Sequence, residues 1–156
     1  MRRKDREITS IDKKIEIIEK NKVCRIALSK DDFPYIVPLN YGYRFEKNKL
    51  TLYFHSAAEG KKIDIIKENN NTCFEIDCDC KLIENEKPCS YGYEFKSVIG
   101  FGKMIITETA EEKINGLNIL MKHQTGKETL CNFPEEALEK LIVYKMEVEE
   151  FTGKQR

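Results

Sequence analysis

Apolar residues alternate with polar ones over much of the chain, and this two-residue period is typical of half-buried β-strands. It predicts six strands, over Val23–Ser29, Phe33–Phe45, Leu50–His55, Thr72–Asp79, Tyr93–Thr107 and Leu141–Phe151. Between them lies the period of three to four residues that is typical of amphipathic helices. It predicts helices from Thr9 or Ser10 to about Asn21, from Ser56 to near Asn69, from Glu111 to about Met121, and over Glu135–Lys140. The charged residues 1–8 are predicted to form an N-terminal arm.

The connections between these elements indicate the class of fold. Short turns at Asp31-Asp32 and Glu46–Lys49 join successive strands, and Leu82–Ser90 is predicted to be an irregular loop. Consecutive strands joined by hairpins pair antiparallel. We therefore expect a mainly β protein, an antiparallel barrel with flanking helices rather than a doubly wound parallel sheet. A single domain is expected to span residues 1–156.

Two of the predicted strands carry residues that interrupt regular pairing. Pro38 has no amide proton, so the ladder must break there or the strand must lie at an edge. A backbone group freed beside Pro38 could bond a ligand instead. Gly100 and Gly102 lie on one face of their strand, which indicates a bend or the close approach of a ligand or of a second backbone.

The composition narrows the classes of partner and the location. Lys+Arg and Asp+Glu both number 27, and the resulting zero formal charge argues against a nucleic-acid partner. No apolar run reaches the length of about 20 residues that a membrane-spanning helix needs. The basic N-terminus lacks the apolar segment of a secretory signal, so we expect a cytoplasmic protein.

The chain contains six cysteines, at positions 24, 73, 78, 80, 89 and 131. Because nothing indicates export, reduced thiols are expected rather than disulfides. Cys73, Cys78, Cys80 and Cys89 cluster with acidic residues between them, but the chain has no Cys-x-x-Cys pair of the kind found in zinc sites. We therefore predict no metal site, and a thiol or metal protein built on this cluster is kept as an alternative.

The strongest chemical signal lies where the third predicted strand turns into a helix. Ser56 and Glu59 have the spacing of a capping box, which predicts Ser56 as the N-cap. Lys61 and Lys62 oppose the helix dipole near its start, but a bound anion would reverse that effect. His55 and the Ser56 hydroxyl add donors. Two interpretations stay open: a phosphate-binding corner, or an ordinary capped surface helix with solvated lysines.

Several motifs stand in a fairly specific order and together cover nearly the whole chain. They are Tyr35–Tyr41, Leu52–Ala57 with Gly60–Lys62, Ser97–Lys103, Met121–Gly126 and Glu149–Lys154. This order resembles the pyridoxamine 5′-phosphate oxidase-like FMN-binding split barrels, and within them the nitroimidazole-resistance branch. The resemblance implies a six-stranded antiparallel split barrel, a homodimer, and one FMN in each of two clefts at the dimer interface.

The resemblance also implies the residues of the site. The strand Val37, Pro38, Leu39 and Asn40 would line the isoalloxazine edge, Phe54, His55 and Ser56 would lie under the ribityl chain, and Lys61 with Lys62 would hold the phosphate. Ser97 stands where many relatives place a longer polar residue, commonly glutamine, against the flavin. The arginine that often accompanies the phosphate lysine in the oxidases is missing, so pyridoxamine phosphate is not supported as a substrate.

The implied function is a flavin-dependent reductase. FMN would take electrons from a reduced nicotinamide and pass them to a small acceptor such as a nitroaromatic (nitroimidazole) compound. His55 is the candidate catalytic group, as a proton donor or to orient the acceptor, whereas a lone histidine such as His123 is more often structural. The alternative function is a non-enzymatic flavin- or heme-binding module, a sensor or carrier, on the same barrel.

Overall fold

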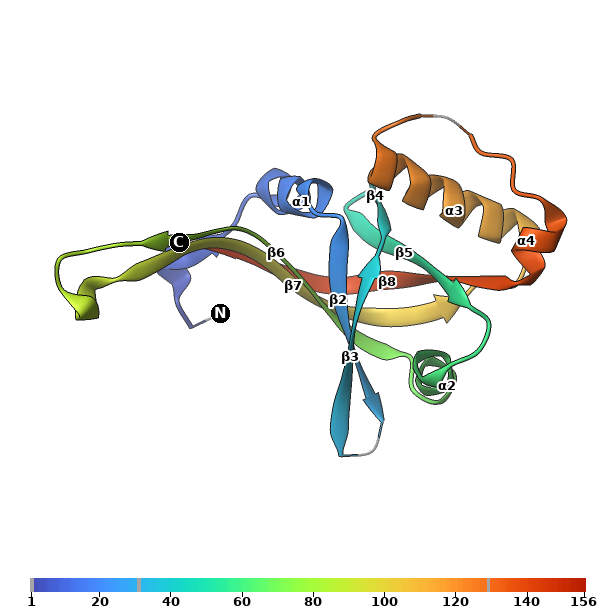
Figure 1. Cartoon of the computed structure of the whole chain (residues 1–156), viewed down its shortest axis with the longest axis horizontal. Coiled ribbons are helices and arrows are strands. Elements are labelled where there is room, and N and C mark those ends of the chain that lie inside the picture. Colours follow the sequence, from blue (N-terminus) through green and yellow to red (C-terminus); the bar gives the residue numbers. More distant parts are fainter. Residues whose placement is uncertain (1, 31, 129) are drawn as a thin grey trace.

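The structure, a computed structural model, describes residues 2–30, 32–128 and 130–156, and these form an eight-stranded antiparallel sheet with helices against it (Figure 1). The strands are β1 Glu7–Ile8, β2 Val23–Lys30, β3 Phe33–Asn40, β4 Gly42–Glu46, β5 Lys49–Ala57, β6 Asn71–Ile83, β7 Gly92–Ile106 and β8 Leu141–Gln155. The helices are α1 Ile11–Lys20, α2 Lys61–Glu68, α3 Ala110–Thr125 and α4 Glu135–Glu139, with 3₁₀ turns at Lys4–Arg6 and Pro88–Ser90.

The sheet closes on itself because its two end strands are neighbours in the chain. The strand order is β3-β2-β6-β7-β8-β5-β4, with β1 paired to β8. β3 and β4 are therefore the two ends of the sheet, yet Tyr41 alone separates them in sequence. This connection forces the ends together without pairing them, which makes a split barrel. Tyr41 is fully buried at the join, and its hydroxyl donates to the Ile18 carbonyl oxygen of α1 at 2.5 Å.

The core fills the inside of this barrel. One apolar cluster combines residues from both ends and the middle of the sheet with the buried face of α1, including Ile18, Ile26, Phe54, Phe74 and Tyr144. Figure 1 shows β6 and β7 continuing past the barrel as a long two-stranded extension, with both chain termini near its base. The predicted class, a mainly β antiparallel barrel with flanking helices, is confirmed.

The count of six strands is wrong, because eight form. The predicted strand Phe33–Phe45 divides at Tyr41 into β3 and β4, and the predicted arm contains β1, which pairs with the end of β8. Both differences depend on distant pairing partners, which a local period does not contain. Pro38 lies in an end strand, as one of the two predicted options required. Asp31, part of a predicted turn, lies outside the described residues.

The pairing of the long strands β6, β7 and β8 contains two irregularities. β6 runs to Ile83, into the predicted loop, past an irregularity at Asp79 (φ 56°). The β7–β8 register shifts between Phe101 and Gly102, and a Cβ at Gly102 would lie 2.1 Å from the Glu147 carbonyl oxygen. Gly102 is therefore required by the close approach of a second backbone, one of the explanations that the sequence left open.

Candidate functional site

The corner between β5 and α2 differs in detail from the prediction. Ser56 is paired with Ile142 inside β5, and its hydroxyl donates to the Ala57 carbonyl oxygen at 2.9 Å. The predicted capping box of Ser56 and Glu59 is therefore wrong. The N-cap of α2 is Gly60, with no side-chain cap, at φ 131° and ψ 160°. Pairing with β8 extends β5 past the residues that could otherwise have capped a helix.

The start of α2 offers unpaired donors. The amides of Ile63 and Asp64 donate to the Gly60 carbonyl oxygen at 2.8 and 3.2 Å. For the amides of Lys61 and Lys62 the described residues provide no acceptor. Two free amides and the positive end of the helix dipole therefore lie at residues that also carry two lysine side chains, a donor set suited to an anion such as phosphate.

A contact across the split joins this corner to β3. The Lys61 ammonium lies 4.8 Å from the centre of the Tyr35 ring, a cation–π distance. Within β3, Val37 and Leu39 pack on the core, while Pro38 and Asn40 are exposed on the other face. β3 pairs with β2 along one edge and, in the described part of the chain, with no strand along the other. The backbone of this strand therefore has an edge available to a ligand.

His55 lies close enough to Lys62 to feel its charge. Partial burial lowers the pKa of its imidazole, and the nearby Lys62 charge lowers the pKa further. His55 therefore favours its neutral form at neutral pH, so it can accept a proton or a hydrogen bond. An anion bound at Lys62 would reduce the second effect. Because side chains alternate along a strand, His55 and Ser56 point to opposite faces of β5.

The floor of the corner contains a buried polar atom that no hydrogen bond satisfies. The Phe54 ring is fully buried and stacks on Tyr144, with centroids 5.7 Å apart, so only its backbone is available to a ligand. The Tyr144 hydroxyl is buried without a partner among the described residues. Burial raises the pKa of Tyr144 to about 12, and the neighbouring Ser56 hydroxyl opposes this effect. Unsatisfied buried groups are rare, and they are often explained by a missing ligand or water.

Tyr144 and Tyr35 were not identified as site residues from the sequence. Tyr144 followed the alternation of its strand as one more apolar position, and its hydroxyl was the single hint of another role. Tyr35 carried no such hint, since its contact with Lys61 joins two elements that are distant in the chain.

Ser97 is not brought to this corner within one chain. It lies on β7, paired with Asp77 on one side and Lys154 on the other. His55 pairs with Val143, which is eleven residues from Lys154 along β8, or about 35 Å of extended strand. If Ser97 takes part in the site, it must come from a second copy of the chain.

His123 occupies a structural position at the far end of β3. It is buried, and its two ring nitrogens lie 2.7 Å from the Tyr41 carbonyl oxygen and 3.0 Å from the Glu19 carbonyl oxygen. The ring therefore holds α3, α1 and the join of the barrel together. This agrees with the prediction that a lone histidine is more often structural.

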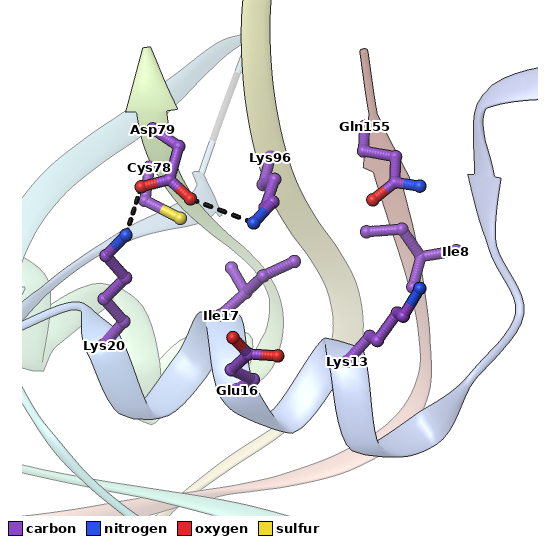
Figure 2. Close-up of a pocket in the computed structure, with 9 residues that line it drawn as sticks. All are labelled: Ile8, Lys13, Glu16, Ile17, Lys20, Cys78, Asp79, Lys96 and Gln155. Atoms are coloured by element: carbon purple, nitrogen blue, oxygen red, sulfur yellow. Dashed lines mark hydrogen bonds and ion pairs between the residues drawn. The ribbon is translucent and has the colours of Figure 1, made fainter.

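A separate cavity lies between α1 and the strands β1, β6, β7 and β8 (Figure 2). Figure 2 shows Asp79 bridging Lys20 and Lys96, with the Asp79–Lys96 ion pair at 3.1 Å, over the sulfur of Cys78. Its volume of about 100 Å³ is smaller than the sites that hold drug-sized ligands. This cavity is too small to hold a flavin.

The cysteines carry free thiols. The described residues contain no group of three or more His, Cys, Asp or Glu side chains placed to hold a metal ion. Among the helices that they form, none has the length and apolar character needed to cross a membrane.

Comparison with known proteins agrees with the fold and adds a family. A candidate 5-nitroimidazole antibiotic resistance protein from Bacteroides thetaiotaomicron VPI-5482 is 32% identical, with a TM-score of 0.82 over 96% of this chain and 86% of that one. The FAD and heme binding protein of Mycobacterium smegmatis shares the fold at 14% identity, with a TM-score of 0.83 over 96% and 73% of the two chains. A candidate pyridoxamine 5′-phosphate oxidase from Listeria innocua is 22% identical, with a TM-score of 0.58 over 90% and 94%.

The sequence matches no protein of curated function. It does match a family model. The family model described as pyridoxamine 5′-phosphate oxidase matches residues 11–155, nearly the whole chain. The chain therefore belongs to the pyridoxamine 5′-phosphate oxidase family.

Proposed function

We propose that this protein is an FMN-dependent oxidoreductase that passes electrons from a reduced nicotinamide to a small acceptor such as a nitroimidazole. The observation that carries the proposal is that Lys61 and Lys62, with their two free amides, stand at the start of α2, where Lys61 also contacts Tyr35 of β3. This donor set suits the phosphate monoester of FMN. Similarity to the Bacteroides protein at 32% identity supports the acceptor class.

The residues divide into four groups by role. Lys61, Lys62 and their amides would hold the phosphate, and Ser56 would contact the ribityl chain. The unpaired edge of Val37–Asn40 would receive the isoalloxazine ring. When bound, FMN supplies the electron transfer, while the protein supplies position and electrostatics. His55, whose lowered pKa favours the neutral imidazole, would orient the acceptor or exchange a proton with solvent.

A homodimer belongs to the same proposal. On the outer face of the sheet Ile36, Ala27, Cys73 and Phe101 lie side by side across β3, β2, β6 and β7. Ile36 is 60% exposed and Phe101 is 51% exposed, so the row is an apolar strip open to solvent. Pro38 and Asn40 share this face. A second copy packed on the strip would wall in the corner and bring its own Ser97 toward it.

The charge of Lys62 gives the sharpest test. We expect Lys62→Glu to weaken FMN binding by about 10- to 100-fold, since hydrogen bonds to charged groups contribute about 1.5–3 kcal/mol. The free energy of unfolding should change by about 0.5 kcal/mol or less, as is usual for surface substitutions. The measurements are FMN titration by fluorescence quenching and urea denaturation.

The control is Lys67→Glu, the same charge reversal in the last turn of α2. It should leave the FMN affinity unchanged. Equal affinities of the two variants would place the phosphate elsewhere. A protein that stays colourless after reconstitution with FMN would refute the proposal. A bound flavin that neither NADH nor NADPH reduces, and that no nitroimidazole reoxidises, would instead identify a non-enzymatic flavin-binding module.

A further inference from the structure

Asn40, the last residue of β3, has its side-chain amide fixed by the polypeptide. Its Nδ2 donates to the Lys22 carbonyl oxygen at 3.1 Å and to Gln124 Oε1 at 3.3 Å. Among the described residues no group donates to Asn40 Oδ1, and the residue is exposed. Both donors of this amide therefore point into the protein, and its acceptor is available to a ligand.

Gln124, near the C-terminus of α3, determines this orientation. Its Nε2 donates to the Lys22 carbonyl oxygen at 3.1 Å and to the Tyr41 carbonyl oxygen at 2.8 Å. Turning the Gln124 amide over would place its oxygen against two carbonyl oxygens, which can only accept. Gln124 Oε1 must therefore point toward Asn40, and Asn40 must donate to it through Nδ2.

The support under Gln124 is rigid. The neighbouring His123 is buried between the Tyr41 and Glu19 carbonyl oxygens, which anchors the end of α3 to the join between β3 and β4. The Tyr41 carbonyl oxygen accepts from both His123 and Gln124. A rotation of the Gln124 amide would break bonds to two separate segments, so the orientation of Asn40 is set before any ligand arrives.

We propose that Gln124 is a positioning residue that makes Asn40 a hydrogen-bond acceptor for the ring of the bound cofactor. The matching donor is an N–H group, and in FMN this is the imide N3–H of the isoalloxazine ring. This inference rests on the proposed function, because it uses FMN bound along β3. It adds a specificity rule: the site favours a ring that carries the imide hydrogen.

The ligand half of the inference is tested with FMN and N3-methyl-FMN, which lacks that hydrogen. The wild-type protein should bind FMN about tenfold more tightly, the effect of losing one hydrogen bond of about 1.4 kcal/mol. In Asn40→Ala and in Gln124→Met this ratio should fall to about two or less. Thr125→Val is the control, since among the described residues the Thr125 hydroxyl bonds to the Met121 carbonyl oxygen and to the Lys127 amide, and not to Asn40 or Gln124. It should keep the full ratio.

The positioning half is tested without flavin. In the NMR spectrum of the apo-protein, the side-chain NH₂ protons of Asn40 should exchange slowly with solvent, and Gln124→Met should speed the exchange of the proton that donates to Gln124. An unchanged exchange rate would refute the role of Gln124. A wild-type FMN preference equal to that of Asn40→Ala would refute the contact with N3–H. Failure of the wild-type protein to bind FMN would refute the proposed function and the ligand half together, while the exchange rates would still decide the positioning half.

Discussion

Two buried tyrosines show how the same side chain serves different ends in this barrel. Tyr41 and Tyr144 are both fully buried and both lie against Phe54. The Tyr41 hydroxyl donates to the Ile18 carbonyl oxygen at 2.5 Å, whereas the Tyr144 hydroxyl has no partner in the described part of the chain. A hydroxyl removed from water without a partner lowers the stability of the fold, so we expect the Tyr144 hydroxyl to destabilise the apo-protein.

We predict opposite effects of removing these two hydroxyl groups from the apo-protein. Tyr144→Phe should raise the free energy of unfolding by about 1 kcal/mol, because it removes an unsatisfied group. Tyr41→Phe should lower it by about 1–3 kcal/mol, because the Ile18 carbonyl oxygen loses its donor. Urea denaturation of both variants gives the comparison. A similar loss of stability in both would show that Tyr144 has a partner in solution.

At the scale of elements, the start of α2 shows where local sequence is overruled. The Ser56–Glu59 spacing predicted a capping box, but Ser56 belongs to β5 because β8 continues the ladder to Ala57. A capping box of the same type does form at α3, where Thr109 and Glu112 exchange hydrogen bonds of 3.2 and 3.3 Å. Gly126 ends α3 in the left-handed conformation that glycine adopts readily.

Because α2 begins later than predicted, Gly60 is its N-cap and has an unusual backbone conformation. Its dihedral angles lie in a region that glycine alone adopts readily, and replacement there costs about 1–3 kcal/mol. We expect Gly60→Ala to lower the free energy of unfolding by this amount. Gly126→Ala is the matched control, with a smaller loss of about 1–2 kcal/mol for a left-handed residue. Apart from the adjacent residues, no atom of the described part of the chain lies within 4 Å of an added Cβ at either glycine, so the expected loss is conformational.

Thermal or urea unfolding of the two glycine variants decides the point. Equal losses would mean that the backbone at Gly60 relaxes into an ordinary conformation. Because Gly60 precedes the free amides of Lys61 and Lys62, the same variant should also weaken FMN binding, whereas Gly126→Ala should not.

At the scale of the whole molecule, the apolar strip across the outer face of the sheet is exposed to solvent. Ile36 and Phe101 lie at its two ends, in β3 and β7. Exposed apolar patches of this kind mark interaction sites in proteins. In our proposal the strip is covered by a second copy, which also completes the cofactor corner.

We therefore expect the wild-type protein to have twice the mass of one chain in light scattering. Phe101→Lys should reduce the mass to that of one chain and weaken FMN binding, because a buried unpaired charge opposes association. Leu130→Lys, at a residue that is 84% exposed and away from the strip, should remain dimeric. A monomeric wild-type protein would contradict the dimer.

The sequence by itself determined the elements, the class of fold and the charges of the site. The periods of two and of three to four residues are local properties, so strands such as β7 and helices such as α1 could be predicted to within a few residues. The charges of Lys61 and Lys62 follow directly from the residue types. The family could be recognised because the order and spacing of the motifs can be read along the sequence.

The tertiary structure alone decided what depends on residues that are distant in sequence. It divided one predicted strand at Tyr41, since the closure of the barrel needs a buried join there. It moved Ser56 into a strand and left the Tyr144 hydroxyl without a partner. It set the amide of Asn40 against Gln124, 84 residues away. Pairing and hydrogen bonding between remote segments leave no periodic trace in the sequence, and they determine which atoms face the site.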